Sequence, residues 1–218
     1  MEQVPAPAVV AAAFLAGSVP FAQLGARRAR QVDLRQVGSG TVSGTALFEV
    51  AGFAPLALFG VLEVAKGAVG PWLAGDRALL GALAGGAAVA GHNWSPWLGG
   101  AGGRGLSPAI GALLPRHPAG SALILSGMVV GRLMGETAVG ALVADALLVP
   151  VLHRTGGRNG RRAALAVLVP MLLKRLAGNR RPDGEHDRVW LWRLLFDRDT
   201  RERLPAAGGE GTSRVGAR

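Results

Sequence analysis

The sequence predicts an all-α, polytopic integral membrane protein with about seven transmembrane helices, some of them short, joined by glycine-rich cytoplasmic loops. Half of its 218 residues are hydrophobic and only 17% are charged, whereas a soluble domain usually carries about 25% charged residues. The charged residues crowd into three stretches, 27–35, 153–162 and 174–203. Long Ala/Gly/Leu/Val segments lie between these clusters, a pattern typical of a chain that crosses a membrane several times.

The apolar segments follow one another along the chain. The first, 4–26, exceeds the roughly 20 residues needed to span a bilayer and ends at a cluster of arginines. The second, about 46–74, is interrupted by Glu63 and Lys66, and the third covers 78–98. Weaker segments follow near 106–114, 119–134, 137–152 and 163–176. Short helices of this kind are tolerated where they pack on protein or line a cavity.

Residues 1–178 are predicted to form a single transmembrane domain, and 179–218 a polar C-terminal tail. Within the tail, "VWLWRLLF" (189–196) is predicted either to lie on the membrane surface as an amphipathic piece or to belong to a disordered segment. If the first arginine-rich loop is cytoplasmic, alternation of the spans places the second glycine-rich loop, 99–105, and the tail in the cytoplasm as well. It also places four arginines outside, against the positive-inside bias: Arg154, Arg158, Arg161 and Arg162.

Composition excludes several classes of function. The chain has no cysteine, so disulfides, thiolate catalysis and cysteine-based metal sites are excluded. The net charge of +10 does not indicate nucleic acid, because the basic residues bracket apolar spans and form no single stripe. His92 has no second histidine or carboxylate at metal-ligand spacing, so no metal site is expected.

Two glycine-rich loops have the composition of anion sites. In "RQVGSGTVSGT" (35–45), glycines let backbone N–H groups turn toward an anion, hydroxyls add donors, and Arg35 adds a bidentate phosphate partner. The loop "GGAGGRG" (99–105) repeats this logic with Arg104. Each alone could be an ordinary flexible turn. Two such loops on one membrane face suggest two phosphorylated substrates, or one substrate with two phosphates.

Ionisable residues inside apolar segments are functional candidates because they are costly there. Glu63 and Lys66 share a helical face at i, i+3 spacing and could also simply form an ion pair. His92 in "GHNW" is either a base or ligand, or a structural histidine at a helix end. Asp145 is either a proton relay, as in a transporter, or the partner of an arginine such as Arg132, and the pairing is favoured.

Several motifs, taken in order, resemble those of the bacterial acyl-phosphate:glycerol-3-phosphate acyltransferases. They are "GSVPFAQL" (17–24), "DLRQVGSG" (33–40), "AKG" (65–67), "GHNW" (91–94), "GGRG" (102–105) and "LKRLAG" (173–178). The resemblance implies a monomeric, seven-helix enzyme of the cell inner or plasma membrane whose active site faces the cytoplasm. It would move a fatty acyl group from acyl phosphate to the 1-hydroxyl of glycerol 3-phosphate, giving lysophosphatidic acid, without cofactor or metal.

The same resemblance implies roles for individual residues. Ser39, Lys66 and Arg104 are expected to be catalytic, with Arg104 in the place of the family's usual lysine. Attack of a hydroxyl on a mixed anhydride needs positioning and charge stabilisation more than a protein nucleophile. The expected substrate-binding residues are Arg35, Gly38, Gly40, Thr41, Gly67, His92, Gly102, Gly103, Gly105 and Arg175.

The chain also departs from the family pattern. Thr41 and Ala46 stand where asparagines are usual, and Glu63 replaces an aspartate. Val169 and Leu172 stand where the last motif usually has histidine and asparagine. The alternative functions are therefore a degenerate paralogue that binds a phosphorylated lipid or acyl phosphate without this turnover, and, less favoured, a small membrane transporter.

Overall fold

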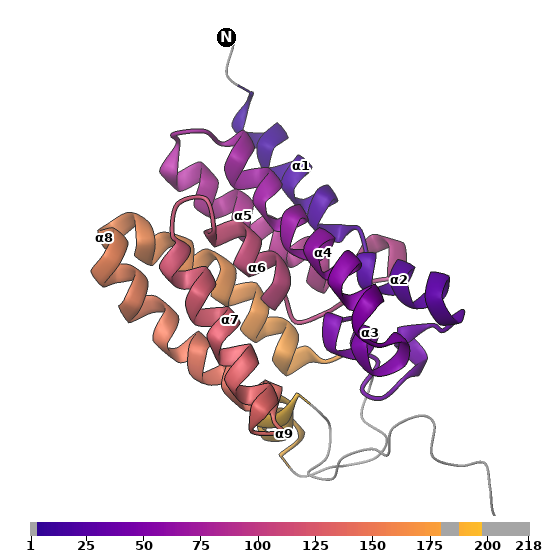
Figure 1. Cartoon of the computed structure of the whole chain (residues 1–218). Coiled ribbons are helices and arrows are strands. Elements are labelled where there is room, and N and C mark those ends of the chain that lie inside the picture. Colours follow the sequence, from indigo (N-terminus) through magenta and orange to yellow (C-terminus); the bar gives the residue numbers. More distant parts are fainter. Residues whose placement is uncertain (1–3, 180–187, 198–218) are drawn as a thin grey trace, which may run out of the picture.

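The computed structural model describes residues 4–179 and 188–197, and this part of the chain contains helices and no strands. Of the predicted polar tail, 179–218, the parts 180–187 and 198–218 lie outside the described residues. The helices are α1 (Ala6–Ser18), α2 (Phe21–Arg30), η1 (Leu34–Gln36), α3 (Gly44–Ala51), α4 (Phe53–Leu73), α5 (Ala78–Asn93), η2 (Pro96–Leu98), α6 (Leu106–Leu113), α7 (Pro118–Leu133), α8 (Thr137–Ala177) and α9 (Val189–Phe196) (Figure 1).

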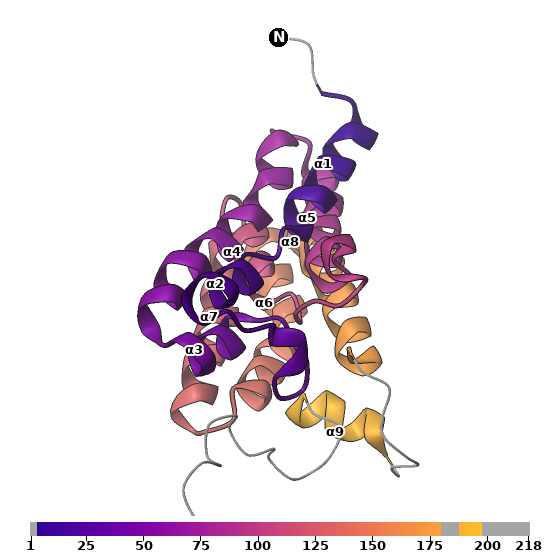
Figure 2. The same cartoon turned by 90° about the vertical axis from the view of Figure 1, so that its right-hand side faces the viewer.

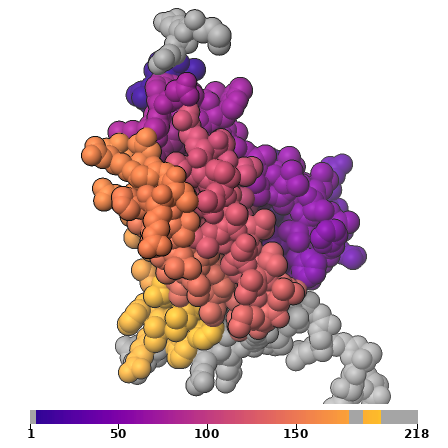
Figure 3. Space-filling view, turned by 60° about the vertical axis from the view of Figure 1, so that its left-hand side comes forward, coloured from indigo at the N-terminus to yellow at the C-terminus, as the bar shows by residue number. Residues whose placement is uncertain are grey.

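The longer helices form a bundle in which α5 packs against α1, α4, α6 and α8 (Figures 1 and 2). One end, which we call the site end, carries the loops 31–43 and 94–105 and the last turn of α8. The opposite end, the far end, carries the loops 74–77 and 114–117 and a turn within α8. Helix α9 packs on α8 at the site end (Figure 3).

Among the described residues, three helical stretches are long and apolar enough, by length and composition, to cross a membrane: Ala6–Arg30, Phe53–Leu73 and Thr137–Ala177. Pro118–Leu133 is a shorter apolar helix. Large apolar side chains such as Leu58, Val61 and Leu133 are exposed on the outside of the bundle. An apolar exterior of this kind suits contact with lipid.

The first predicted span is not one uninterrupted helix. It breaks at Val19 and Pro20, between α1 and α2, because proline has no N–H to continue the helical hydrogen bonds. Charged side chains from α4 satisfy backbone groups beside the break: Lys66 Nζ donates to the Val19 carbonyl at 2.6 Å, and Glu63 Oε1 accepts from the Ala22 N–H at 2.8 Å. The charged groups of Glu63 and Lys66 therefore bind backbone groups at the break between α1 and α2.

The predicted segments 137–152 and 163–176 are the two arms of α8. The helix folds back at Gly157, whose φ of 56° lies in the region that favours glycine. The arms pack closely, since a methyl group at Gly160 would lie 2.0 Å from the Leu152 carbonyl oxygen. Small residues that allow such close approach are typical of helix packing in membranes.

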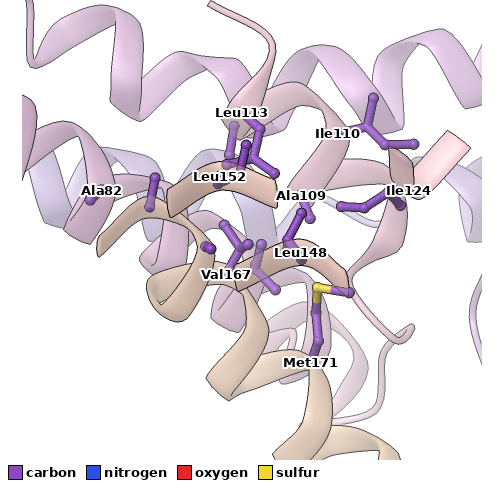
Figure 4. Packing of buried hydrophobic residues seen from close by; sticks show 13 residues of the cluster. Ala82, Ala109, Ile110, Leu113, Ile124, Leu148, Leu152, Val167 and Met171 are labelled. Atoms are coloured by element: carbon purple, nitrogen blue, oxygen red, sulfur yellow. The ribbon is translucent and has the colours of Figure 1, made fainter. Parts of the chain in front are cut away.

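The main apolar core lies between α5, α6, α7 and both arms of α8 (Figure 4). It consists of aliphatic side chains, with Leu148, Leu152 and Ile124 fully buried. Met171, from the second arm of α8, extends this core toward the site end, where it lies against Gly105. The core thus fixes the second glycine-rich loop relative to α8.

Candidate functional site

The two glycine-rich loops pack directly against each other at the site end. The Val42 N–H donates to the Gly102 carbonyl at 3.1 Å, and Arg35 Nη1 donates to the Leu98 carbonyl at 3.4 Å. The loops are 60 or so residues apart along the chain by their numbering, so only the tertiary fold brings them together. Two candidate anion cradles therefore form one continuous surface.

Asn179 joins the loops. Its Nδ2 donates to the Gly40 carbonyl at 3.0 Å and to the Gly102 carbonyl at 2.7 Å, while its Oδ1 accepts from the Gly102 N–H at 3.2 Å. One amide side chain thus fixes a glycine of each loop. A primary amide can do this because it has two donors and an acceptor in one plane.

Beneath the second loop lies a buried group formed by Glu63, Lys66 and His92. Lys66 Nζ is 2.7 Å from Glu63 Oε2 and 3.0 Å from His92 Nδ1, and Glu63 Oε2 is 3.1 Å from His92 Nδ1. Each of the three residues is less than 9% exposed. The ion pair of Glu63 and Lys66, one of the two alternatives that the sequence left open, is therefore present, and His92 contacts both of its members.

The second glycine-rich loop rests on His92. The Gly103 N–H donates to the His92 carbonyl at 3.3 Å, and a methyl group at Gly103 would lie 2.1 Å from His92 Nε2. Only glycine fits at this contact. The buried ion pair therefore contacts His92, and His92 in turn contacts the loop that carries Arg104.

Four candidate cations each have a carboxylate partner from this chain. Arg35 Nη2 is 2.6 Å from Asp33 Oδ2, and Lys66 pairs with Glu63. Arg104 Nε pairs with Asp197, just beyond α9, and Arg104 Nη1 donates to the Lys174 carbonyl at 3.2 Å. A substrate phosphate that binds a guanidinium here must share it with, or displace, a carboxylate. The fourth pair is Arg175 with Asp145, 3.8 Å apart.

The partner of Asp145 is therefore Arg175, and the pairing with Arg132 is wrong. The guanidinium of Arg132 lies instead over the Phe48 ring, 5.1 Å from its centroid. Arg175 also donates to the Ala138 carbonyl, so it connects the two arms of α8. The fold-back at Gly157 explains the difference, because it brings two positions 30 residues apart in number, 145 and 175, side by side.

The Asp33–Arg35 pair orders the start of the first loop. Asp33 also accepts from the Arg35 backbone N–H at 3.0 Å and so caps η1. The hydrogen bonds from Arg35 lower the pKa of Asp33 from 3.8 to about 2. The Arg35 guanidinium is thus held at the start of the first loop by the Asp33 carboxylate, which stays ionised at neutral pH.

Within the first loop, Ser39 Oγ lies 2.8 Å from Thr41 Oγ1. Thr41 is buried, whereas Gly38 and Gly40 form the turn with φ values of 51° and 71°. The loop therefore has the conformation that glycines permit, with its two hydroxyls in contact with each other.

Gly67 has a different role from the one expected. A methyl group there would lie 2.0 Å from the Pro108 carbonyl oxygen, so the backbone of α6, and not a ligand, approaches this glycine. Gly102 and Gly105 also make close contacts, with the His92 carbonyl and with Val89 respectively. These glycines are required for packing around the site.

Sequence reasoning missed two side chains that contact the loops. Asn179 gave no signal, because it simply follows the last apolar segment. Lys174 donates to the Gly100 carbonyl at 3.1 Å and lies over the Trp94 ring. It lies within "LKRLAG", so its position in that motif was a usable signal.

Val169 and Leu172, the departures in the last motif, do not replace the missing polar groups. Val169 is 52% exposed on the outer side of α8, whereas Lys174 points inward to the second loop. In the described part of the chain, no group of three or more His, Cys, Asp or Glu side chains could hold a metal ion.

Comparisons with known proteins agree on one family. The family model described as glycerol-3-phosphate acyltransferase matches residues 7–179. A glycerol-3-phosphate acyltransferase from Synechococcus sp. (strain CC9902) is 34% identical over 169 residues, which are 76% of this chain and 84% of the relative. One from Jannaschia sp. (strain CCS1) is 36% identical over 172 residues, 77% of this chain and 83% of the relative.

The fold is similar to that of a solved structure, the glycerol 3-phosphate form of PlsY (YgiH), described as an integral membrane glycerol 3-phosphate acyltransferase. The TM-score is 0.70 at 24% identity, over 78% of this chain and 88% of that chain. The lysophosphatidic acid form of the same protein gives a TM-score of 0.68 at 21% identity. The helical arrangement is therefore similar to that of PlsY.

Proposed function

Because the chain belongs to the glycerol-3-phosphate acyltransferase family, we propose that it transfers a fatty acyl group from acyl phosphate to the 1-hydroxyl of glycerol 3-phosphate. The products are lysophosphatidic acid, for phospholipid synthesis, and inorganic phosphate. Each substrate carries a phosphate, which fits a site built from two anion-binding loops.

The observation that carries this proposal is the joining of the loops by Asn179 and the Val42–Gly102 hydrogen bond. Adjacent cradles hold two phosphates side by side, so that the hydroxyl of one substrate lies beside the acyl carbon of the other. We assign one phosphate to the first loop, with Arg35 and Ser39, and the other to the second loop, with Arg104. Holding two reactants in this way can supply a large part of the rate enhancement.

The chemistry needs no covalent enzyme intermediate. The glycerol oxygen forms a bond to the acyl carbonyl carbon, the bond from that carbon to the phosphate oxygen breaks, and phosphate leaves with the electron pair. The proton of the attacking hydroxyl passes to the leaving phosphate. Arg104 and the backbone N–H groups of the loops stabilise the negative charge that develops. Lys66 acts indirectly. Its contact with the Val19 carbonyl holds the break between α1 and α2 in place, and its contact with His92 supports the second glycine-rich loop.

The topology supports seven crossings. The proposed crossings are the α1–α2 unit, the α3–α4 unit, α5, α6, α7 and the two arms of α8, and the eight-residue α6, which is shorter than a bilayer, is buried among the others. We propose that the site end faces the cytoplasm, where glycerol 3-phosphate is available, and that the chain acts as a monomer within the cell membrane. Residues 1–178 then form one transmembrane unit.

An acyl-transfer assay tests the proposal. Membranes that contain the protein are supplied with palmitoyl phosphate and labelled glycerol 3-phosphate, and labelled lysophosphatidic acid is measured. We expect product above an empty-membrane control, and a loss of product with Arg104→Ala. Product equal to the empty-membrane control would reject acyl transfer to this acceptor.

A second candidate function is binding without turnover. It is favoured by Val169 and Leu172, which leave α8 without the amide and imidazole groups usual in the last motif, and by the carboxylate partner of each candidate cation. Saturable binding of glycerol 3-phosphate with no product would support it. A transporter is less favoured, because Asp145 is paired with Arg175.

A further inference from the structure

A cavity of about 300 Å³ opens at the far end of the bundle, remote from both glycine-rich loops. Its walls come from α4, α5, α6 and α8. Its inner part is formed by small or apolar residues, including Ala82, Ala112 and Val167, which are buried. Its outer part is formed by Arg116, His117 and Asn159, next to exposed turns. The cavity thus has an apolar interior and a polar, cationic mouth.

The surface around this mouth is strongly basic. The loops and the turn that form it are in contact: Arg116 donates to the Gly75 carbonyl and Asp76, and Gly156 packs against the His117 ring. Among the described residues, one carboxylate, that of Asp76, stands at this end. The arginines there are Arg77, Arg116, Arg154, Arg158, Arg161 and Arg162.

This charge is not explained by membrane topology. The positive-inside bias concentrates basic residues on one face of the membrane, but here both ends of the bundle are basic. Arg27, Arg28 and Arg30 lie at the site end, and six arginines lie at the far end. Basic pockets between transmembrane helices on the cytoplasmic side of a membrane bind anionic lipid head groups, and the far end offers the same combination of cations and apolar walls.

We propose that the far-end cavity binds an anionic phospholipid, with the phosphate at Arg116, His117 and Asn159 and the start of one acyl chain in the apolar interior. A phosphate ester needs a charge-assisted donor, which Arg116 supplies. The apolar walls exclude a purely ionic ligand as the full occupant, since a free anion leaves them uncovered. This lipid is distinct from both substrates, because it binds at the opposite end of the bundle from the two loops.

The residues at the mouth of the cavity contribute to phosphate binding in different ways. Asp76, the carboxylate partner of Arg116, is fully exposed, so a lipid phosphate can replace it without leaving a buried charge. Burial and the adjacent Arg116 lower the pKa of His117 below its usual range. The ring is therefore neutral at neutral pH and offers a hydrogen bond in place of a second charge.

Lipid binding to the full-length protein in detergent tests this proposal by native mass spectrometry. The probes are phosphatidylglycerol and phosphatidylcholine with the same acyl chains. We expect phosphatidylglycerol to bind at least ten-fold more tightly. Arg116→Gln should weaken its binding about ten-fold, because a charge-assisted hydrogen bond is lost. The matched control is Arg154→Gln, an arginine at the same end that does not line the cavity, and it should change the affinity less than two-fold.

A second pair of variants tests the acyl-chain part of the site. Gly81 lines the cavity, and a methyl group there would meet its nearest neighbours at 3.7 Å, an ordinary contact. Gly81→Leu should therefore fill the cavity and weaken lipid binding about ten-fold. Gly60→Leu is the control, because Gly60 lies on α4 outside the cavity and has similar room. If Gly81→Leu lowers the melting temperature strongly, the proposed lipid site is tested only by comparing the lipid affinities of Arg116→Gln and Arg154→Gln.

Three outcomes overturn the proposal. Equal binding of the two lipids shows that the head group is not recognised. An equal loss of lipid affinity in Arg116→Gln and Arg154→Gln shows that the lipid responds to the overall surface charge and not to a defined site. Competition by inorganic phosphate or glycerophosphoglycerol at the concentration of the lipid shows a free-anion site without a chain. Acyl-transfer activity measured beside the binding distinguishes a failure here from a failure of the proposed function.

Discussion

Glu63 and Lys66 form a buried ion pair one turn apart in α4, with Oε2 2.7 Å from Nζ. Both side chains also satisfy backbone groups at the break between α1 and α2. The pair therefore does two tasks at once. It neutralises two charges inside an apolar segment, and it hydrogen-bonds the backbone on both sides of the non-helical turn between α1 and α2.

Lys66→Met should destabilise the protein by about 3–5 kcal/mol, because it leaves the buried carboxylate of Glu63 without its cation. Thermal and denaturant unfolding in detergent measure the loss. The double variant Glu63→Gln/Lys66→Met should be less destabilised than the sum of the two single variants. Additive losses would show that the two groups do not depend on each other.

Asn179→Ala should raise KM for glycerol 3-phosphate or acyl phosphate about ten-fold, since the three hydrogen bonds that join the loops are lost. Asn179→Asp should be worse than Asn179→Ala, because it turns a carboxylate toward the carbonyls of Gly40 and Gly102. Steady-state kinetics with each substrate varied separately measure the effect. An Asp variant better than the Ala variant contradicts the bridging role.

Arg104→Ala should lower kcat/KM about 10- to 100-fold, as expected for the loss of a charge-assisted hydrogen bond in the transition state. Arg104→Lys should remain within about ten-fold of the wild type, because it keeps the charge but loses the bidentate geometry. Initial rates in the acyl phosphate assay measure both. Equal losses in the two variants would show that charge at position 104 is not what matters.

Asp197→Asn should lower KM for the phosphate that Arg104 binds, because the neutral amide competes less well for the guanidinium than the carboxylate does. The control is Asp76→Asn, which removes an exposed carboxylate at the far end and should leave KM unchanged. Kinetics of the two variants, measured at the same ionic strength, separate the local effect from a change in overall charge. A KM that rises with Asp197→Asn would instead make Asp197 a support of the loop.

The Asp33–Arg35 pair should stabilise the protein at neutral pH and lose this effect in acid. The pKa of Asp33 is lowered from 3.8 to about 2 in the folded protein, so its contribution is fully present above about 3.8 and disappears as the pH falls through about 2. Melting temperatures of the wild type and Asp33→Asn, compared across this range, check it. The difference between them should shrink only between these two values.

Particular residues show what sequence patterns could predict. The i, i+3 spacing predicted that Glu63 and Lys66 share one helical face, with an ion pair as one of two alternatives, since helix geometry alone decides which positions lie together. Composition predicted the two glycine-rich loops, and the order of the short motifs predicted the family. Each of these depends on local geometry or on residues that are near in the sequence.

Other features needed the tertiary structure. The fold-back at Gly157 selects Arg175, and not Arg132, as the partner of Asp145. The approach of α6 shows that Gly67 is a packing residue, and the end of α8 brings Asn179 to both loops. No pattern within a segment carries this information, because each contact joins elements that the chain separates by many residues.

The sequence by itself determined that this is an integral membrane protein with two glycine-rich loops, buried charges and the motifs of one acyltransferase family. Hydrophobicity, turn chemistry and helical spacing act over a few residues, so they can be read along the chain. Only the tertiary structure decided that the loops form one surface above Lys66 and His92, and that each candidate cation has a carboxylate partner. These facts depend on how helices pack, which is set by contacts between distant segments.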